Sequence, residues 1–142
     1  MGIVRELVVS FPIFILVAYL GSHLVVVPTG SMTPTINEGD VVLVDNIEAL
    51  GFIKEFNAAD VKNGDIIIYK SSNPVENTDS IIHRVVAINE SDGRKYFTLK
   101  GDANRAADDE KVYPDNITGK VITWGGNPIK MPLGWLINRF NT

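Results

Sequence analysis

A serine and a histidine are the residues with which this chain could carry out nucleophilic chemistry. Ser31 lies in the stretch PTGSMTPTI, residues 28–36, between two prolines that restrict the backbone. A serine hydroxyl becomes a good nucleophile only when a base removes its proton. The chain has 2 histidines, and since His23 falls in a long uncharged apolar run, His83 is the remaining base. We therefore expect Ser31 and His83 to act together if the fold brings them into contact.

A histidine base works best when a carboxylate holds its second ring nitrogen. We predict that the strand over 95–100 pairs with the histidine strand over 80–88 through a hairpin loop at 91–93. The acidic residues after the second strand then return beside His83; they are Asp102, Asp108, Asp109 and Glu110. The residues alone leave open which of them is the partner.

Each of these features also has a structural interpretation. Serines between glycine and proline are usually turn residues, single strand histidines are usually core residues, and acidic loop segments are usually solvated. Found together in one small domain, the three features favour Ser/His/Asp hydrolysis.

Composition limits the other functions that the chain can have. Its 142 residues suit a single domain, and its net charge of −4 gives no electrostatic footprint for nucleic acid. There are 0 cysteines, which excludes disulfides and thiol catalysis. We expect no cofactor and no metal.

The N-terminal part of the chain has the character of a membrane segment. No charged residue occurs between Glu6 and Glu38, and the apolar run over 7–27 is long enough to span a bilayer. A cleavable signal peptide has a shorter apolar region and a small-residue cleavage site, so we expect an uncleaved anchor. We divide the chain into an anchor over 1–27 and a β-rich domain over 28–142, with His23 as an interfacial residue.

Short β-branched runs bounded by turn residues predict five strands in the second part. The expected fold is mainly β: an antiparallel, partly closed β-domain on a single N-terminal transmembrane helix. The predicted strands cover 40–45, 65–70, 80–88, 95–100 and 119–124.

Two further segments carry weaker patterns. Apolar residues over 47–56 have helical spacing, which Gly51 weakens. The C-terminal tail over 128–142 mixes aromatic and basic residues, so it either lies at the membrane interface or packs on the core as a last element.

Four segments in order resemble the conserved boxes of type I signal peptidases. PTGSMTPTINEGDVVLVD resembles the nucleophile box, NGDIIIYK the second box, SIIHRVVAI the base box and KGDANRAADD the acid box. The base box carries a lysine in the bacterial branch, whereas this chain has His83. The sequence is thus similar to the endoplasmic-reticulum and archaeal branch of the family.

This resemblance implies a role for each matching residue. Ser31 is the nucleophile, His83 the general base and Asp108 the acid, with Asp102 as a second, supporting acid and Asp109 as the nearest rival of Asp108.

Three further residue roles are expected at the nucleophile segment. The resemblance implies an oxyanion hole from the backbone N–H of Ser31 and the hydroxyl of Thr29. We also expect Met32, next to the nucleophile, to contact the substrate.

The function implied is that of a membrane-bound serine endopeptidase that removes signal peptides from secreted and membrane preproteins. Its partners would be signal peptides, the lipid bilayer and the protein translocation machinery. Its place would be the cell membrane or the endoplasmic reticulum membrane, single-pass, with the catalytic domain on the extracytoplasmic side.

Two other functions fit parts of the pattern. A repressor-type self-cleaving peptidase shares a Ser-Met motif but uses lysine as base and is soluble. A membrane-tethered, non-catalytic binding subunit of a secretion complex would need no catalytic residues.

Overall fold

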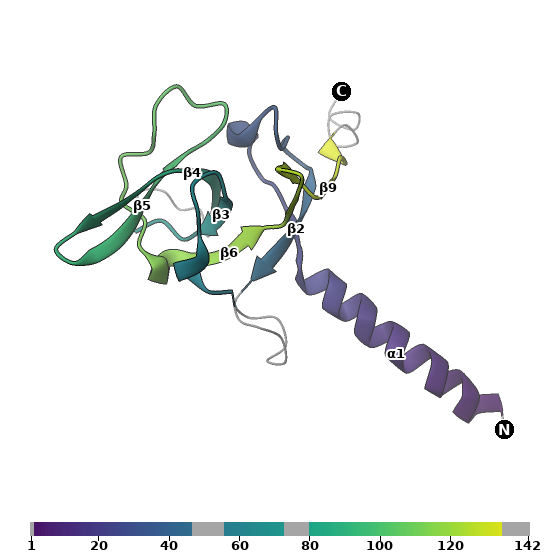
Figure 1. Cartoon of the computed structure of the whole chain (residues 1–142). Helices are drawn as coiled ribbons and strands as arrows, with labels where there is room; N and C mark the ends of the chain where they lie inside the picture. Colours follow the sequence, from purple (N-terminus) through teal and green to yellow (C-terminus); the bar gives the residue numbers. More distant parts are fainter. Residues whose placement is uncertain (1, 47–55, 73–79, 135–142) are drawn as a thin grey trace.

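The fold consists of one N-terminal helix and an antiparallel β-domain (Figure 1). The computed structural model describes residues 2–46, 56–72 and 80–134. The elements are α1 (Gly2–Ser22), β1 (Leu24–Val26), η1 (Gly30–Met32), β2 (Val41–Asn46), η2 (Ala58–Asp60), β3 (Ile66–Tyr69), β4 (Ile81–Ser91), β5 (Arg94–Lys100), η3 (Pro114–Asn116), β6 (Ile117–Val121), β7 (Thr123–Trp124), β8 (Asn127–Pro128) and β9 (Lys130–Met131).

The main sheet joins strands that are far apart in the sequence. Its order is β1-β2-β6-β3-β4-β5; β9 also pairs with β2, and β7 and β8 form a separate hairpin. The predicted strands over 40–45, 65–70, 80–88 and 95–100 and the antiparallel pairing are confirmed. The run over 119–124 does not form one strand: β6 ends at Val121, and Thr123–Trp124 is β7 of the separate hairpin. The partial closure is not confirmed: in the described part of the chain the sheet is open, because its two end strands, β1 and β5, do not pair with each other.

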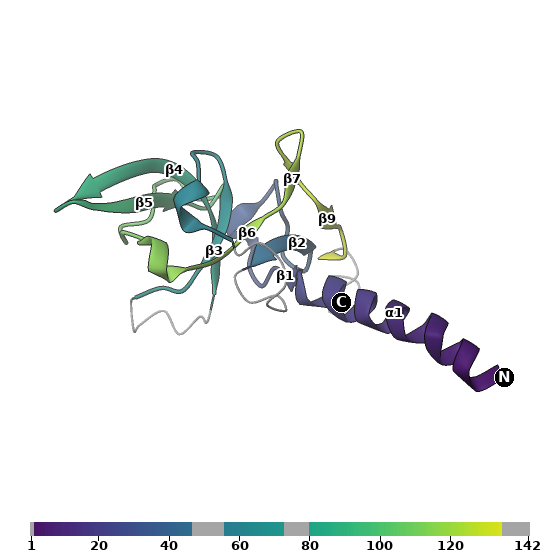
Figure 2. The same cartoon turned by 60° about the horizontal axis from the view of Figure 1, so that its bottom comes forward.

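The helix α1 points away from the sheet in both views (Figures 1 and 2). Its described side chains at positions 8, 11 and 13–17 are apolar and about half to two-thirds exposed. Within the described residues, no helix is both long enough and apolar enough to cross a bilayer. The transmembrane anchor therefore stays a prediction.

The end of the apolar run belongs to the β-domain and not to the helix. α1 ends at Ser22, and the β-branched valines that follow form β1, with Val25 opposite Val42 of β2. Val27 is buried in the core. His23 was expected at the membrane interface, but it is buried in the protein. Its Nδ1 lies 2.8 Å from the carbonyl oxygen of Val44, and this hydrogen bond connects the end of the helix to β2.

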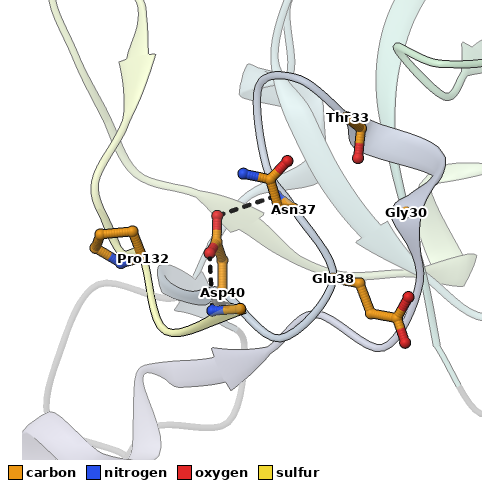
Figure 3. A pocket seen from close by; sticks show the side chains of 7 residues that line it. Gly30, Thr33, Asn37, Glu38, Asp40 and Pro132 are labelled. Carbon is orange, nitrogen blue, oxygen red and sulfur yellow. Dashed lines mark hydrogen bonds between the residues drawn. The ribbon is translucent and has the colours of Figure 1, made fainter. Parts of the chain in front are cut away.

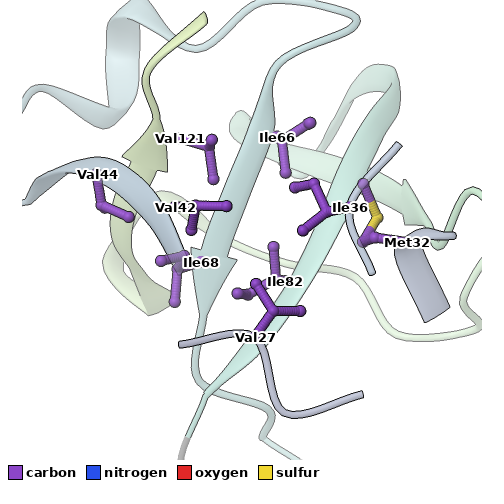
Figure 4. Close-up of a cluster of buried hydrophobic side chains, with 9 residues drawn as sticks. All are labelled: Val27, Met32, Ile36, Val42, Val44, Ile66, Ile68, Ile82 and Val121. Atoms are coloured by element: carbon purple, nitrogen blue, oxygen red, sulfur yellow. The ribbon is translucent and has the colours of Figure 1, made fainter. Parts of the chain in front are cut away.

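The strand β3 explains how the core is built. Its run IIIY is buried at every position because both faces of the sheet are covered there. Ile66 and Ile68 belong to one cluster of buried side chains, which also contains Val27, Met32, Ile36, Val42, Val44, Ile82 and Val121 (Figure 4). Ile67 and Tyr69 belong to a second cluster, which also contains Phe56, Val61, Val85, Phe97, Leu99, Val112 and Ile117.

The hairpin of β4 and β5 has a loop of two residues, because Ser91, predicted in the loop over 91–93, is the last residue of β4 and lies opposite Arg94. Asp92 and Gly93 have φ of 53° and 71°, the left-handed conformation that a tight hairpin turn requires. This hairpin carries His83 on one strand and leads into the acidic segment from the other.

Parts of two predictions lie outside the described residues. They are the helical segment, except for Phe56, and residues 135–142 of the tail. The described start of the tail packs on the domain, because Lys130 and Met131 form β9 against β2.

Candidate active site

The short helix η1 presents the serine. Thr29 before it and Thr33 after it have extended backbones, and the N–H of Thr33 donates to the carbonyl of Gly30. Ser31 is half-buried, whereas Met32 is fully buried in the cluster of Figure 4. The Met32 side chain fills the core beside the turn that carries Ser31, and its expected contact with the substrate stays a prediction.

The histidine lies at the buried start of β4. His83 is opposite Ile67 of the central strand β3 and is 8% exposed, so its ring is held between strands. Its Nε2 lies 3.1 Å from Ser31 Oγ. The pair predicted from residue types alone is in hydrogen-bond contact across 52 positions of sequence.

The acid that reaches the histidine is Asp108. Its Oδ2 lies 2.5 Å from His83 Nδ1, and its backbone N–H donates to the carbonyl of Leu99 at 2.8 Å. Tyr69 adds a long contact, its hydroxyl lying 3.5 Å from the same Oδ2. Asp109 is exposed and makes no hydrogen bond or ion pair with the part of the chain that the structure describes.

This arrangement defines the roles of the two ring nitrogens. With the ring proton on Nδ1, His83 donates to the Asp108 carboxylate and Nε2 accepts from the Ser31 hydroxyl. That is the tautomer in which a histidine can take a proton from a serine.

Asp102 lies in the same loop but has a different partner. Arg84 donates to both of its carboxylate oxygens, from Nε at 2.9 Å and from Nη2 at 2.7 Å, and from Nη1 to the carbonyl of Gly64. Hydrogen bonding from Arg84 lowers the pKa of Asp102, although burial opposes the shift, and a hydrogen bond with Thr35 adds to it. Hydrogen bonding to Asp102 likewise raises the pKa of Arg84. Asp102 thus joins the acid loop to the histidine strand without touching His83.

The acid loop also contacts the backbone of the nucleophile. Residues 101–104 form a turn closed by a hydrogen bond from the N–H of Asn104 to the carbonyl of Gly101, and the N–H of Ala103 donates to the carbonyl of Ser31 at 2.8 Å. A Cβ on Gly101 would lie 2.7 Å from that carbonyl oxygen and 3.0 Å from His83 Nε2. Only glycine permits this approach.

Thr29 lies beside the nucleophile on its N-terminal side. Its Oγ1 is 3.3 Å from Ser31 Oγ, and it is exposed.

A cavity of about 420 Å³ adjoins the nucleophile turn (Figure 3). Ser31 does not line it; the lining residues are Gly30, Thr33, Asn37, Glu38, Asp40, Pro132 and Gly134. Burial would raise the pKa of Asp40, but hydrogen bonds from Lys130 and from the N–H groups of Asn37 and Gly134 outweigh it and lower the pKa. Asp40 therefore connects the segment that follows the nucleophile turn to β9 and the residues after it.

Three residues that shape the candidate site were not predicted from the sequence. Arg84 is adjacent to His83, and its only signal was a basic residue within a buried strand. Nothing in the sequence marked Gly101 or Tyr69, because their contacts with the site are made by residues that are distant in the sequence. Among the described residues, no group of three or more acidic or histidine side chains is arranged to hold a metal ion.

Comparisons with known proteins match this chain to one family. The family model described as signal peptidase, peptidase S26, matches residues 1–90, which include Ser31 and His83. An uncharacterized protein of Methanocaldococcus jannaschii is 28% identical over 171 residues, covering 81% of this chain and 82% of that protein.

Named relatives are catalytic subunits of signal peptidase complexes. SEC11C of Homo sapiens is 34% identical over 96 residues, covering 66% of this chain and 43% of the relative. SEC11 of Yarrowia lipolytica is 35% identical over 98 residues, covering 69% and 49%. The chain thus spans about half the length of these relatives. No solved structure matches it significantly. On the family match and these identities, the chain belongs to the signal peptidases of peptidase family S26.

Proposed function

We propose that this protein is a membrane-bound serine endopeptidase that removes signal peptides from preproteins, with Ser31 as nucleophile, His83 as general base and Asp108 as the acid that orients the ring. The observation that carries the proposal is the continuous contact from Ser31 Oγ through His83 to Asp108. Three groups in hydrogen-bond reach in this order are the arrangement that activates a serine.

The first chemical step forms an acyl-enzyme. Ser31 Oγ bonds to the scissile carbonyl carbon while its proton moves to His83 Nε2. The carbon–nitrogen bond then breaks, and Nε2 gives that proton to the leaving amine. Asp108 stays ionised and stabilises the positive ring during the transfer.

The oxyanion that forms in this step needs hydrogen-bond donors that point at it. We assign the Ser31 N–H and the Thr29 hydroxyl to this role, supported by the closeness of Thr29 Oγ1 to the nucleophile. One such donor stabilises the transition state by about 3–4 kcal/mol.

The substrate and its location follow from the family and from α1. An extended peptide adds a strand beside the nucleophile segment, and shallow apolar contacts select small side chains near the cut. The exposed apolar side chains of α1 support attachment to a bilayer, where signal peptides and the translocation machinery meet the enzyme on the extracytoplasmic side. Tethering raises the effective substrate concentration without any new contact.

The two other candidate functions have less support. A repressor-type peptidase would use a lysine where this chain has His83 in contact with Ser31. A binding subunit would not need a hydrogen-bonded relay ending at a half-buried serine.

Replacing the nucleophile tests the proposal. We expect Ser31→Ala to reduce cleavage of a purified precursor in detergent by about 10⁶-fold, below detection. Ser91→Ala, which changes a serine hydroxyl at the end of β4, should leave cleavage unchanged and serves as the control. Normal cleavage by Ser31→Ala would rule out the assignment.

A further inference from the structure

The turn over 101–104 carries a side-chain amide to the edge of the catalytic pair. Asn104 is exposed, and its side chain makes no hydrogen bond with any residue that the structure describes. Its Nδ2 lies 2.8 Å from the point that a Cβ on Gly101 would occupy, and His83 Nε2 lies 3.0 Å from the same point. The amide is therefore next to the ring nitrogen that contacts Ser31.

The separation of the Asn104 amide and His83 Nε2 is one that water can bridge. Each group is about one hydrogen-bond length from the Gly101 point, so the two are at most two hydrogen-bond lengths apart. One water molecule bridges two polar groups across such a gap by bonding to both.

We infer that Asn104 positions the water that hydrolyses the acyl-enzyme, an assignment that rests on the proposed function. In the resting protein, Nε2 faces the Ser31 hydroxyl at 3.1 Å. After acylation, Ser31 Oγ is an ester oxygen without a hydrogen, so Nε2 is free to accept from a water. A second hydrogen bond to the Asn104 amide fixes that water near the ester.

The step balances with the groups present. The water oxygen bonds to the acyl carbon while one water proton moves to His83 Nε2. The bond from carbon to Ser31 Oγ then breaks, and Nε2 returns the proton to Oγ. The products are a free carboxylic acid and the original serine. Asn104 gives and takes no proton, so it is a positioning residue and its loss slows this step alone.

The test compares Asn104→Ala with the parent on a peptide ester of a signal-peptide sequence, for which acylation is fast and deacylation limits turnover. We expect kcat and KM to fall together by about 10- to 100-fold while kcat/KM is unchanged. Intact mass after acid quench should show the acyl-enzyme as the main species. Hydroxylamine, a nucleophile that needs no positioning, should speed release more in the variant than in the parent.

Arg105→Ala is the matched control, since Arg105 is the exposed next residue of the same loop. It should leave kcat and KM at parental values. An unchanged kcat in Asn104→Ala would overturn the inference, as would equal falls in kcat and kcat/KM, which place the defect in acylation.

Failure of the inference is distinguishable from failure of the proposed function. If the parent forms an acyl adduct on Ser31 and Asn104→Ala releases it at the parental rate, only the role of Asn104 is wrong. If the parent forms no adduct on Ser31, or if Ser31→Ala still turns over the ester, the proposed function is wrong.

Discussion

At the scale of single residues, the site depends on which of two adjacent carboxylates faces the histidine. The backbone N–H of Asp108 is held by the carbonyl of Leu99, which aims its side chain at His83. Asp109, one position on, is exposed. The backbone hydrogen bond of Asp108 thus determines which of the two adjacent aspartates contacts His83.

Replacing each carboxylate by an amide tests this difference. We expect Asp108→Asn to reduce kcat by about 10⁴-fold, because an amide no longer stabilises the charged ring or fixes its tautomer. Asp109→Asn should retain parental kcat in the same precursor-cleavage assay. The reverse pattern would assign the role to Asp109.

Asp102 is expected to affect stability in a pH-dependent way. Because folding lowers its pKa through Arg84, the ionised pair stabilises the folded state above the ordinary value of 3.8, and this stabilisation is lost as pH falls below that value. Asp102→Asn should cost about 1 kcal/mol at pH 7 and progressively less as the pH falls below 4. Urea denaturation at several pH values measures the difference. An equal deficit at pH 7 and pH 2.5 would contradict the ionic explanation.

At the scale of residues, chemistry restricted the choice of a base. With only 2 histidines in the chain, His83 was the base that composition left, and the structure places it against Ser31. The partner of Asp102 was not predictable, because an ion pair across strands depends on the register of β3, β4 and the loop after β5.

At the scale of elements, the turn over 101–104 is the contact between the acid loop and the nucleophile. It binds the carbonyl of Ser31 through the N–H of Ala103 and leaves no space for a side chain at Gly101. The position of the serine is therefore set from two sides, by the buried Met32 below and by this turn beside it.

A methyl group at Gly101 should disturb catalysis more than folding. Gly101→Ala places a carbon 2.7 Å from the Ser31 carbonyl oxygen, so the turn or η1 must shift. A displacement of about 1 Å at a catalytic group costs about 100-fold in rate. We expect that loss in kcat with a near-native circular dichroism spectrum. Ala103→Ser, at an exposed position of the same turn, should keep its activity. Full activity of Gly101→Ala would show that the close approach has no catalytic consequence.

Element prediction located β2 to β6, ran the last of these strands on into β7, and failed at the boundary with α1. Alternating or continuous β-branched runs gave β2 to β6 because side-chain shape and burial favour a sheet there. The valines of β1 were assigned to the helix since an apolar run has no internal marker of where a helix stops. Their place is determined by pairing with β2, a long-range contact.

At the scale of the whole molecule, an exposed apolar helix extends from a domain with two well-filled clusters. Phe11 and Phe14 on α1 are 65% and 70% exposed. Such side chains avoid water when a hydrocarbon phase is present.

The proposed membrane attachment can be tested on the full chain. We expect the parent to float with phosphatidylcholine vesicles and the double variant Phe11→Ser, Phe14→Ser to partition at least about 100-fold less, since burying two phenylalanines contributes about 3 kcal/mol or more. The control replaces Val86 and Ile88, exposed apolar residues of β4, by serine. Equal flotation of all three proteins would argue against attachment through α1.

The late strand β6 occupies the middle of the sheet, where it joins β2, which follows the serine turn, to β3, which adjoins the histidine strand. A nascent polypeptide therefore completes the sheet that holds Ser31 and His83 together only when residues 117–121 have been synthesised. On the proposed function, the chain acquires peptidase activity only after this strand has joined the sheet.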